Sequence, residues 1–243
     1  MKILFSLLLW FIFWINLIIF VPVLILISFF VHSEKIKNKL VFNFCSYITK
    51  SLLIKTEIQY LSEETKNIFP IIFVANHVSF FDLFISGATL PGYPRGFELS
   101  THFNKPFYGW FIKKFGQVPI NPKNKSTILH SIKIATELLH NKIRNFFVMP
   151  EGSRTRSGAL GTFNHGAFFL SMHSNIPIAP VIYKNLFSIN NPNSILIHPG
   201  KITVIIGNLI YPEQFKNKEE MAQYTKNYMN TILKEKTCEL TNS

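Results

Sequence analysis

Residues 76–82 read Asn-His-Val-Ser-Phe-Phe-Asp, and the chemistry of the chain is best approached from this stretch outward. It follows the apolar run Ile71–Val74, whose β-branched and aromatic residues predict a buried strand. Ser79 precedes Asp82 by three residues, which predicts a helix that begins here with Ser79 as its N-cap. The expected order is strand, turn and helix, with His77 in the turn.

The chain contains a single aspartate, Asp82, five residues after His77. On one regular helix these residues would point about 140° apart, because each residue turns by roughly 100°. We therefore expect His77 in the turn and Asp82 in the first helical turn, where a carboxylate can hold one imidazole nitrogen and leave the other free to accept a proton. Such a pair is a general base with its orienting acid. The alternative is that Asp82 completes a capping box and His77 is a polar turn residue.

Composition restricts the partners. The net charge is +12, although only 16% of the residues are charged. Such a protein favours anionic partners such as lipid headgroups, an acidic carrier protein or phosphorylated substrates, and the alternative is a basic surface that serves solubility. Basic residues are spread along the chain without a nucleic-acid-binding module, so nucleic acid is not expected. Cys45 and Cys238 form no CxxC or Cys/His pattern, and neither a disulfide framework nor a metal site is expected.

Residues 3–31 contain no charged side chain and are rich in Leu, Ile, Phe and Trp. As one straight helix these roughly 29 residues would run about 44 Å, against a hydrocarbon core of about 30 Å. We expect the segment to tilt, or to break at Asn16 or Pro22. The run is too long for a secretory signal, and no small-residue cleavage site follows it.

The next segment, residues 35–55, predicts an amphipathic helix. Its apolar residues recur at helical spacing: Leu40, Val41, Phe44, Ile48 and Leu52. The helix would lie at a membrane interface with its basic side toward headgroups, or it would face the protein core. Lysines directly after the apolar run indicate a catalytic domain on the cytoplasmic side of the inner membrane. We therefore expect a membrane anchor over residues 1–55, spanning or monotopic, and a second domain over residues 56–243.

The remaining chain alternates apolar runs with helical patterns, which predicts an α/β fold. The expected strands are Ile71–Val74, Gln117–Ile120, Asn145–Met149, Ile176–Ile182, Ser194–His198 and Ile202–Ile206. The expected helices are Phe80–Thr89, Phe107–Phe115, Ser126–Asn141, Phe163–Ser174 and Lys218–Lys236. The final residues, Cys238–Ser243, are expected to be loose.

A second stretch, Pro150–Gly158, follows a predicted strand and reads Pro-Glu-Gly-Ser-Arg-Thr-Arg-Ser-Gly. Its glycines allow close backbone approach and its arginine forks match phosphate oxygens, so it is a candidate phosphate receptor; the alternative is a solvated basic loop. Like His77 it lies at a strand end, where α/β sheets gather their chemistry. No Gly-x-Ser-x-Gly serine is present, so we expect the substrate's own hydroxyl to be the nucleophile.

Taken together, residues 76–82 and 150–158 make the chain resemble the glycerolipid acyltransferase family, which includes the 1-acylglycerol-3-phosphate acyltransferases. Four blocks over roughly residues 70–210 match in order: Asn76-His77-x-Ser79-x-x-Asp82, Pro150-Glu151-Gly152-Ser153-Arg154, Phe163 with Gly166–Phe168 and Leu170, and Ile176–Val181. The resemblance implies a mixed sheet flanked by helices behind an N-terminal membrane-anchoring segment. It also implies that His77 is the general base and Asp82 its orienting partner.

The resemblance further implies a reaction and a binding site. A fatty acyl group would move from an acyl thioester, acyl-ACP or acyl-CoA, to the free hydroxyl of 1-acylglycerol 3-phosphate, giving phosphatidic acid with no cofactor. The residues implied in acceptor binding are Glu151, Gly152, Ser153 and Arg154, with Arg156 adding charge nearby. Ser153 replaces the family's threonine and keeps its hydroxyl.

Two departures from the family pattern concern the acceptor. The block that usually reads Gly-x-x-x-Ile-Asp-Arg is here Gly116–Asn121 followed by Pro122, so we expect Lys123 to supply the missing charge. The family's Lys-Glu-Leu is here Phe97–Leu99. The alternatives are therefore another acceptor, such as a lyso-aminolipid, another lysophospholipid or glycerol 3-phosphate, or a non-catalytic membrane protein that binds lipid.

Overall fold

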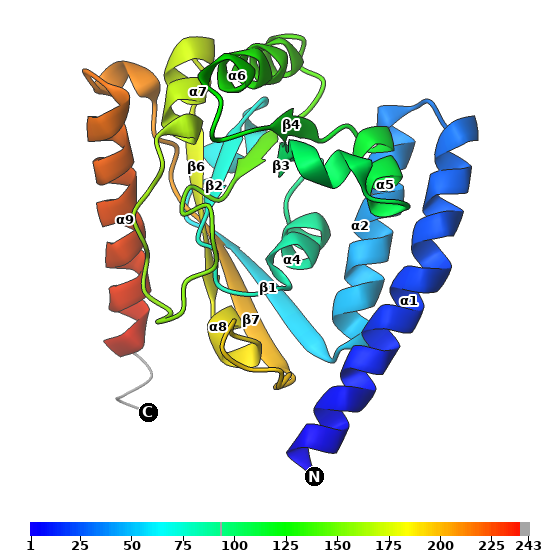
Figure 1. The fold of residues 1–243 in the computed structure, drawn as a ribbon. Helices are drawn as coiled ribbons and strands as arrows, with labels where there is room; N and C mark the ends of the chain where they lie inside the picture. Colours follow the sequence, from blue (N-terminus) through cyan, green and yellow to red (C-terminus); the bar gives the residue numbers. More distant parts are fainter. Residues whose placement is uncertain (93, 239–243) are drawn as a thin grey trace.

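The computed structural model describes residues 1–92 and 94–238 and forms a central sheet between two groups of helices (Figure 1). The strands are β1 (Ile54–Tyr60), β2 (Ile72–Ala75), β3 (Arg95–Leu99), β4 (Val118–Ile120), β5 (Phe146–Val148), β6 (Ile178–Lys184) and β7 (Gly200–Ile206). Within the described residues they form one seven-stranded sheet in the order β1-β7-β6-β2-β5-β3-β4. Neighbours pair in parallel except β6 and β7, which are antiparallel. The predicted mixed sheet is confirmed.

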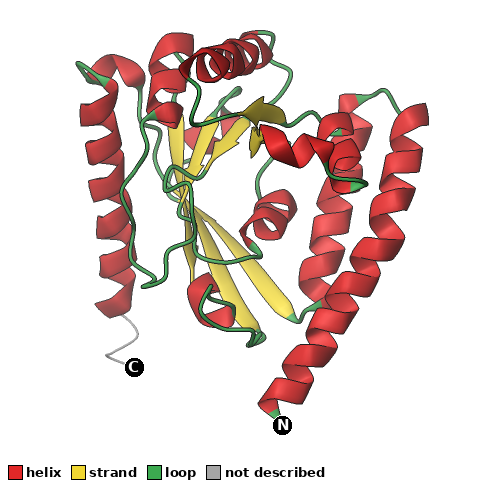
Figure 2. Cartoon of the chain, in the orientation of Figure 1, coloured by secondary structure: helices red, strands yellow, loops and turns green. Residues whose placement is uncertain are grey.

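The helices cover both faces of the sheet (Figure 2). Their bounds are α1 (Lys2–Phe30), α2 (Glu34–Ser51), α3 (Glu64–Asn67), α4 (Asp82–Thr89), η1 (Ser100–Asn104), α5 (Tyr108–Lys114), α6 (Lys125–His140), α7 (Gly166–Ser174), α8 (Leu186–Ile189), η2 (Pro212–Gln214) and α9 (Lys218–Cys238). Helices α1, α2 and α4 pack on one face, and α6, α7 and α9 pack on the other. Both faces are therefore apolar.

The central strand β2 shows why two apolar layers form. Successive side chains of a strand point to opposite faces. Phe73 accordingly belongs to the core shared with α1, α2 and α4, whereas Ile72 and Val74 belong to the core shared with α6, α7 and α9. All three side chains are fully buried. A continuous apolar run is what a strand covered on both faces requires, and it places the end of β2 in the middle of the molecule.

The predicted elements are found with a few exceptions. Five of the expected strands and all of the expected helices are confirmed within a few residues of their predicted ends. The strand expected over Ser194–His198 is wrong, because that segment bonds to side chains instead of a neighbouring strand: Ile197 N–H donates to Ser6 Oγ. Strands β1 and β3 were not predicted. Of the residues expected to be loose, Cys238 ends α9 and the others lie outside the described residues.

Helix α1 continues through both expected break points. Asn16 is buried, and its side-chain amide donates to the carbonyl of Ile12 at 2.7 Å, so it stays within the helical turn. Pro22 lies inside the helix without ending it. Among the described residues, α1 is the one helix long and apolar enough to cross a membrane. One face of α1 is buried against the protein, and most of its other apolar side chains are exposed.

Helix α2 faces the protein core. Val41, Ile48 and Leu52 are at most 1% exposed and pack in the core that α4 shares, which is the second of the two alternatives for this segment. Together with Leu9 and Phe13 of α1, they join the residues of the sheet in one cluster. The division of the chain after residue 55 stays a prediction, and the first strand of the sheet begins just before that position.

Candidate active site

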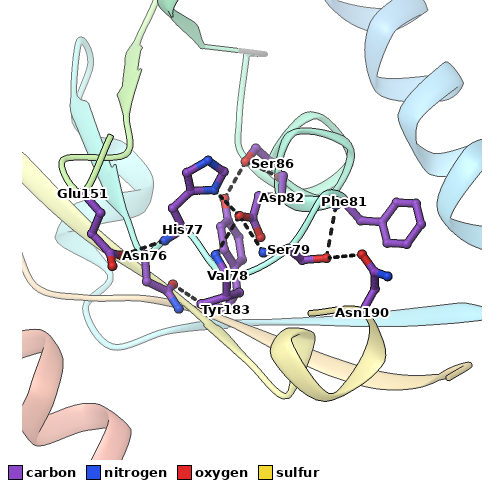
Figure 3. Close-up of polar contacts among 10 residues, drawn as sticks. All are labelled: Asn76, His77, Val78, Ser79, Phe81, Asp82, Ser86, Glu151, Tyr183 and Asn190. Atoms are coloured by element: carbon purple, nitrogen blue, oxygen red, sulfur yellow. Dashed lines mark hydrogen bonds and ion pairs between the residues drawn. The ribbon is translucent and has the colours of Figure 1, made fainter. Parts of the chain in front are cut away.

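The turn between β2 and α4 holds the candidate catalytic pair. The expected order of strand, turn and helix is confirmed, since β2 ends at Ala75 and α4 begins at Asp82. Ser79 is not the N-cap; that position is taken by Phe81. Ser79 Oγ instead accepts the Phe81 N–H at 3.2 Å and donates to Asn190 Oδ1 at 3.4 Å (Figure 3). The helix starts later than predicted because the turn wraps around the Asp82 carboxylate.

Three donors meet one oxygen of that carboxylate. His77 Nδ1 lies 2.5 Å from Asp82 Oδ2, and the backbone N–H groups of Val78 and Ser79 donate to the same oxygen at 2.9 and 3.0 Å. The Asp82 side chain is 1% exposed, whereas that of His77 is 23% exposed. Figure 3 shows the second ring nitrogen of His77 pointing away from the carboxylate. The pairing predicted from the sequence is confirmed. The bond from the Ser79 N–H to Asp82 is one half of a capping box, and the other half is missing because the Ser79 side chain bonds to Phe81 and Asn190.

The environment of Asp82 is unusual for a carboxylate. Burial raises the pKa of Asp82 above its ordinary value, while the hydrogen bond with His77 and the two backbone donors oppose that rise. Among the described residues, Asp82 Oδ1 is buried without a hydrogen-bond partner. A buried carboxylate that lacks full solvation favours a positive charge beside it. Asp82 is therefore suited to stabilise an imidazolium at His77.

The Pro-Glu-Gly loop holds His77 by its backbone. Glu151 Oε1 accepts the His77 N–H at 2.9 Å, and Glu151 Oε2 accepts the Gly161 N–H at 2.8 Å. The Thr155 N–H donates to the His77 carbonyl at 2.8 Å. The sheet brings these segments together because β2 and β5 are parallel neighbours that end at the same edge. The expected convergence of the two stretches on one site is confirmed.

A polar pocket of about 260 Å³ lies beside this contact. It is lined by Glu151, Ser153, Arg154, Thr155, Gly161, Thr162 and Asn164. Ser153 and Arg154 are exposed, and Gly152 has a φ of +68°, a left-handed conformation that glycine adopts readily. The candidate binding residues of this loop therefore lie close to His77 and open to solvent.

Of the predicted binding residues, Gly152, Arg156 and Lys123 do not line this pocket. Arg156 is exposed, and its carbonyl accepts the side-chain amide of Asn193 at 2.9 Å. Lys123 is exposed in the turn after β4, and two strands, β3 and β5, separate β4 from β2 in the sheet. The structure does not bring Lys123 to the His77 turn.

Three residues that support the pair were given no role in the analysis of the sequence: Asn76, Ser86 and Tyr183. Ser86 Oγ donates to the Asp82 carbonyl at 2.7 Å and lies 2.5 Å from the Tyr183 hydroxyl. The Asn76 side chain accepts the Tyr183 N–H at 2.8 Å, which joins the end of β2 to β6. Burial raises the pKa of the Tyr183 hydroxyl, so it stays protonated as a donor. Ser86 follows Asp82 by one helical turn, a spacing that could have indicated it; Tyr183 carries no such signal.

Comparison with known proteins agrees with this arrangement. The acyltransferase family model matches residues 57–184, more than half of the chain. The 1-acyl-sn-glycerol-3-phosphate acyltransferase of Saccharomyces cerevisiae is 28% identical over 196 residues, which cover 79% of this chain and 64% of the yeast protein. The chloroplastic 1-acyl-sn-glycerol-3-phosphate acyltransferase BAT2 of Brassica napus is 31% identical over 162 residues, covering 65% of this chain and 45% of that protein. The chain thus spans less than two thirds of either relative.

The fold has a close counterpart among solved structures. The crystal structure of the 1-acyl-sn-glycerophosphate acyltransferase of Thermotoga maritima matches with a TM-score of 0.80 and 20% identity, covering 97% of this chain and 96% of that one. The class of fold is therefore that of the helix-flanked mixed sheet found in this enzyme. From the family match, the chain belongs to the acyltransferase family.

Proposed function

We propose that this protein transfers a fatty acyl group from an acyl thioester to the free hydroxyl of 1-acylglycerol 3-phosphate, giving phosphatidic acid. The observation that carries the proposal is the His77 Nδ1 to Asp82 Oδ2 contact of 2.5 Å, with the second ring nitrogen directed away from the carboxylate. Curated relatives named 1-acyl-sn-glycerol-3-phosphate acyltransferase support the choice of acceptor.

In the proposed reaction, His77 acts as the general base. The acceptor hydroxyl loses its proton to His77 Nε2 while its oxygen attacks the thioester carbonyl carbon. The buried Asp82 carboxylate stabilises the imidazolium that forms. The tetrahedral intermediate then breaks its carbon–sulfur bond, and the imidazolium returns the proton to the departing thiolate. These steps account for every bond formed and broken and for the transferred proton. The proposed reaction therefore needs no covalent acyl-enzyme, metal or other cofactor.

The loop after β5 would bind the acceptor's phosphate. Ser153 and Arg154 line the polar pocket beside His77, and a guanidinium fork matches phosphate oxygens. Both Glu151 oxygens accept backbone N–H groups, so we assign Glu151 to holding the site together. Gly152 allows the turn, and Arg156 would add charge at the rim. Lys123 lies too far along the sheet to share the same phosphate.

The donor would be acyl-ACP or acyl-CoA. Both are anionic, and a net charge of +12 favours their approach. We also propose that the protein associates with a membrane. The exposed apolar face of α1 supports this, and the proposed lysophospholipid acceptor resides in a bilayer. Lysines 35, 37 and 39, just after that helix, favour a catalytic domain on the cytoplasmic side of the inner membrane.

Acyl transfer in liposomes tests the proposal. Wild type is assayed with acyl-ACP and with acyl-CoA, beside His77→Ala and a control, His130→Ala, whose histidine is exposed on α6. We expect turnover that His77→Ala lowers by about 10²- to 10⁴-fold and His130→Ala leaves unchanged. Acylation of a lyso-aminolipid or glycerol 3-phosphate in place of 1-acylglycerol 3-phosphate would overturn the acceptor but keep the reaction. Inactivity of folded protein with every acceptor would overturn the enzymatic function.

A further inference from the structure

Helix α1 contacts the catalytic turn directly through its aromatic side chains. Phe13 is fully buried, and its ring lies 5.5 Å from that of Phe80 and 5.7 Å from that of Phe81. Trp10 stacks on Phe81 with 5.6 Å between ring centroids and an interplanar angle of 30°. Phe81 is also buried, and it is the residue directly before Asp82. The apolar N-terminal helix therefore packs on the two residues that directly precede Asp82.

A second connection runs from α1 to the segment after α8. Ser6 Oγ accepts the Ile197 N–H at 3.1 Å and donates to the Ile197 carbonyl at 3.3 Å. The Trp10 indole N–H donates to the Ile195 carbonyl at 2.7 Å. Ser6 and Ile197 are 2% exposed, so these bonds form away from solvent. This is the segment that was expected to be a strand, and α1 bonds the backbone of its residues Ile195 and Ile197.

Asn190 carries this second connection back to the turn. Its side-chain amide donates to the Leu196 carbonyl at 3.1 Å and to the Ser194 carbonyl at 3.4 Å. Its side-chain oxygen accepts the Ser79 hydroxyl at 3.4 Å (Figure 3). Ser79 in turn donates its N–H to Asp82 Oδ2. Two separate routes from α1 thus meet at the residues that hold the Asp82 carboxylate.

We propose that Trp10 and Phe13 are positioning residues for the His77–Asp82 pair, so that α1 is part of the support of the active site. The inference rests on the proposed role of His77 as general base. A displacement of a catalytic group by about 1 Å can lower the rate by about 10²-fold. Loss of the aromatic contact would leave the turn free to shift while the sheet and the binding loop stay in place.

The two faces of α1 provide a matched pair of variants. Phe13 is 0% exposed and Phe11, on the same helix, is 62% exposed. Phe13→Ala removes the contact with the turn, Phe13→Leu refills most of the space, and Phe11→Ala removes an equal ring from the outer face. All are purified in the same detergent, checked by thermal unfolding, and assayed for kcat, for KM of the acceptor and for the pH dependence of kcat.

We expect Phe13→Ala to lower kcat by about tenfold or more, with the acceptor KM within about twofold of wild type and a shifted pH profile of kcat. Phe13→Leu should regain most of the rate, and Phe11→Ala should match wild type. Equal kinetics for Phe13→Ala and Phe11→Ala would overturn the inference. So would a loss of rate in Phe13→Ala without a change in the pH profile.

Amide hydrogen exchange gives a readout that does not depend on turnover. Phe13→Ala should raise exchange in the peptide covering residues 76–84, whereas Phe11→Ala should not. Trp10→Phe, which keeps a ring but removes the bond to the Ile195 carbonyl, should raise exchange in residues 194–198. Unchanged exchange in residues 76–84 of Phe13→Ala would overturn the inference. If wild type is inactive but Phe13→Ala still raises exchange in residues 76–84 and Phe11→Ala does not, the proposed function is overturned. The contact of α1 with the turn would then still be supported.

Discussion

Glu151 holds the backbone of His77 from 74 residues away in the sequence, with its Oε1 atom 2.9 Å from the His77 nitrogen. The other carboxylate oxygen accepts the Gly161 N–H at 2.8 Å, so the side chain bridges the catalytic turn and the far end of the binding loop. A carboxylate can accept at both oxygens, and an amide of the same shape cannot. The chemistry of this position is therefore more restricted than its place in a polar loop implies.

Glu151→Gln should impair the enzyme although it preserves the shape of the side chain. One of the two backbone N–H groups loses its acceptor, which costs about 1–3 kcal/mol when the group stays desolvated. We expect kcat to fall by about tenfold in Glu151→Gln and further in Glu151→Ala, each with a lower Tm. The control is Glu213→Gln, at an exposed position on η2. A wild-type kcat in Glu151→Gln would contradict the bridging role.

Asp82→Asn should separate stability from activity. Burial raises the pKa of Asp82 above its ordinary value of 3.8, so ionising this carboxyl costs more in the folded protein than in the unfolded chain. Asp82 therefore contributes most to stability below its unfolded-state pKa and loses that contribution as the pH rises through its folded-state pKa. Asparagine does not titrate. The Tm of wild type minus that of Asp82→Asn should fall as the pH rises from about 4 to 7, while kcat of the variant drops by about 10²-fold or more.

A Tm difference between wild type and Asp82→Asn that grows with pH over this range would contradict the direction of the pKa shift. The measurement uses matched detergent micelles at each pH.

Arg154 and Lys123 should behave differently although both were candidates for the acceptor's phosphate. Arg154 lines the polar pocket beside His77, whereas Lys123 follows β4, beyond β5 and β3. We expect Arg154→Ala to raise the acceptor KM by about tenfold, and Arg154→Lys by less, because an ammonium keeps the charge but loses the fork. Lys123→Ala should stay within about twofold of wild type. Equal effects at the two positions would contradict the proposed phosphate site.

Gly152→Ala should distort the binding loop. A Cβ at this position would lie 3.0 Å from the Asn164 side-chain nitrogen, and the φ of +68° disfavours any residue with a Cβ. The left-handed conformation costs about 1–2 kcal/mol for alanine, so we expect a lower Tm and a higher acceptor KM. Gly166→Ala is the control, because it begins α7 and a Cβ there meets nothing within 4 Å. Equal Tm values for Gly152→Ala and Gly166→Ala would contradict the backbone strain expected for alanine at position 152.

The pairing of His77 with Asp82 could be predicted because both residues belong to one local unit of strand, turn and helix. Apolar patterning located β2, and a spacing of five residues placed the two side chains on different parts of that unit. The assignment of Ser79 as N-cap was wrong because local pattern does not show that backbone N–H groups of the turn would use the Asp82 carboxylate first. Which donors reach Asp82 Oδ2 depends on the three-dimensional shape of the turn, which the sequence pattern does not show.

Other features depend on contacts between distant segments. Strand β3 was missed because Gly96 and Glu98 are poor strand formers, and its place in the sheet comes from pairing with β4 and β5. The strand expected over Ser194–His198 was wrong because side chains from α1 and from Asn190, just after α8, bond to much of its backbone. The position of Lys123 follows from the order of strands, which no single stretch of sequence specifies.

The bond between Ser6 and Ile197, 191 residues apart, has a consequence for the order of folding. Helices α2 and α4 follow α1 closely in the chain, whereas the segment that bonds to Ser6 and Trp10 follows much later. We therefore expect α1 to pack on α2 and α4 first and to bond to residues 195–197 afterwards. The aromatic contact with the catalytic turn would then form before the hydrogen-bonded connection through Asn190.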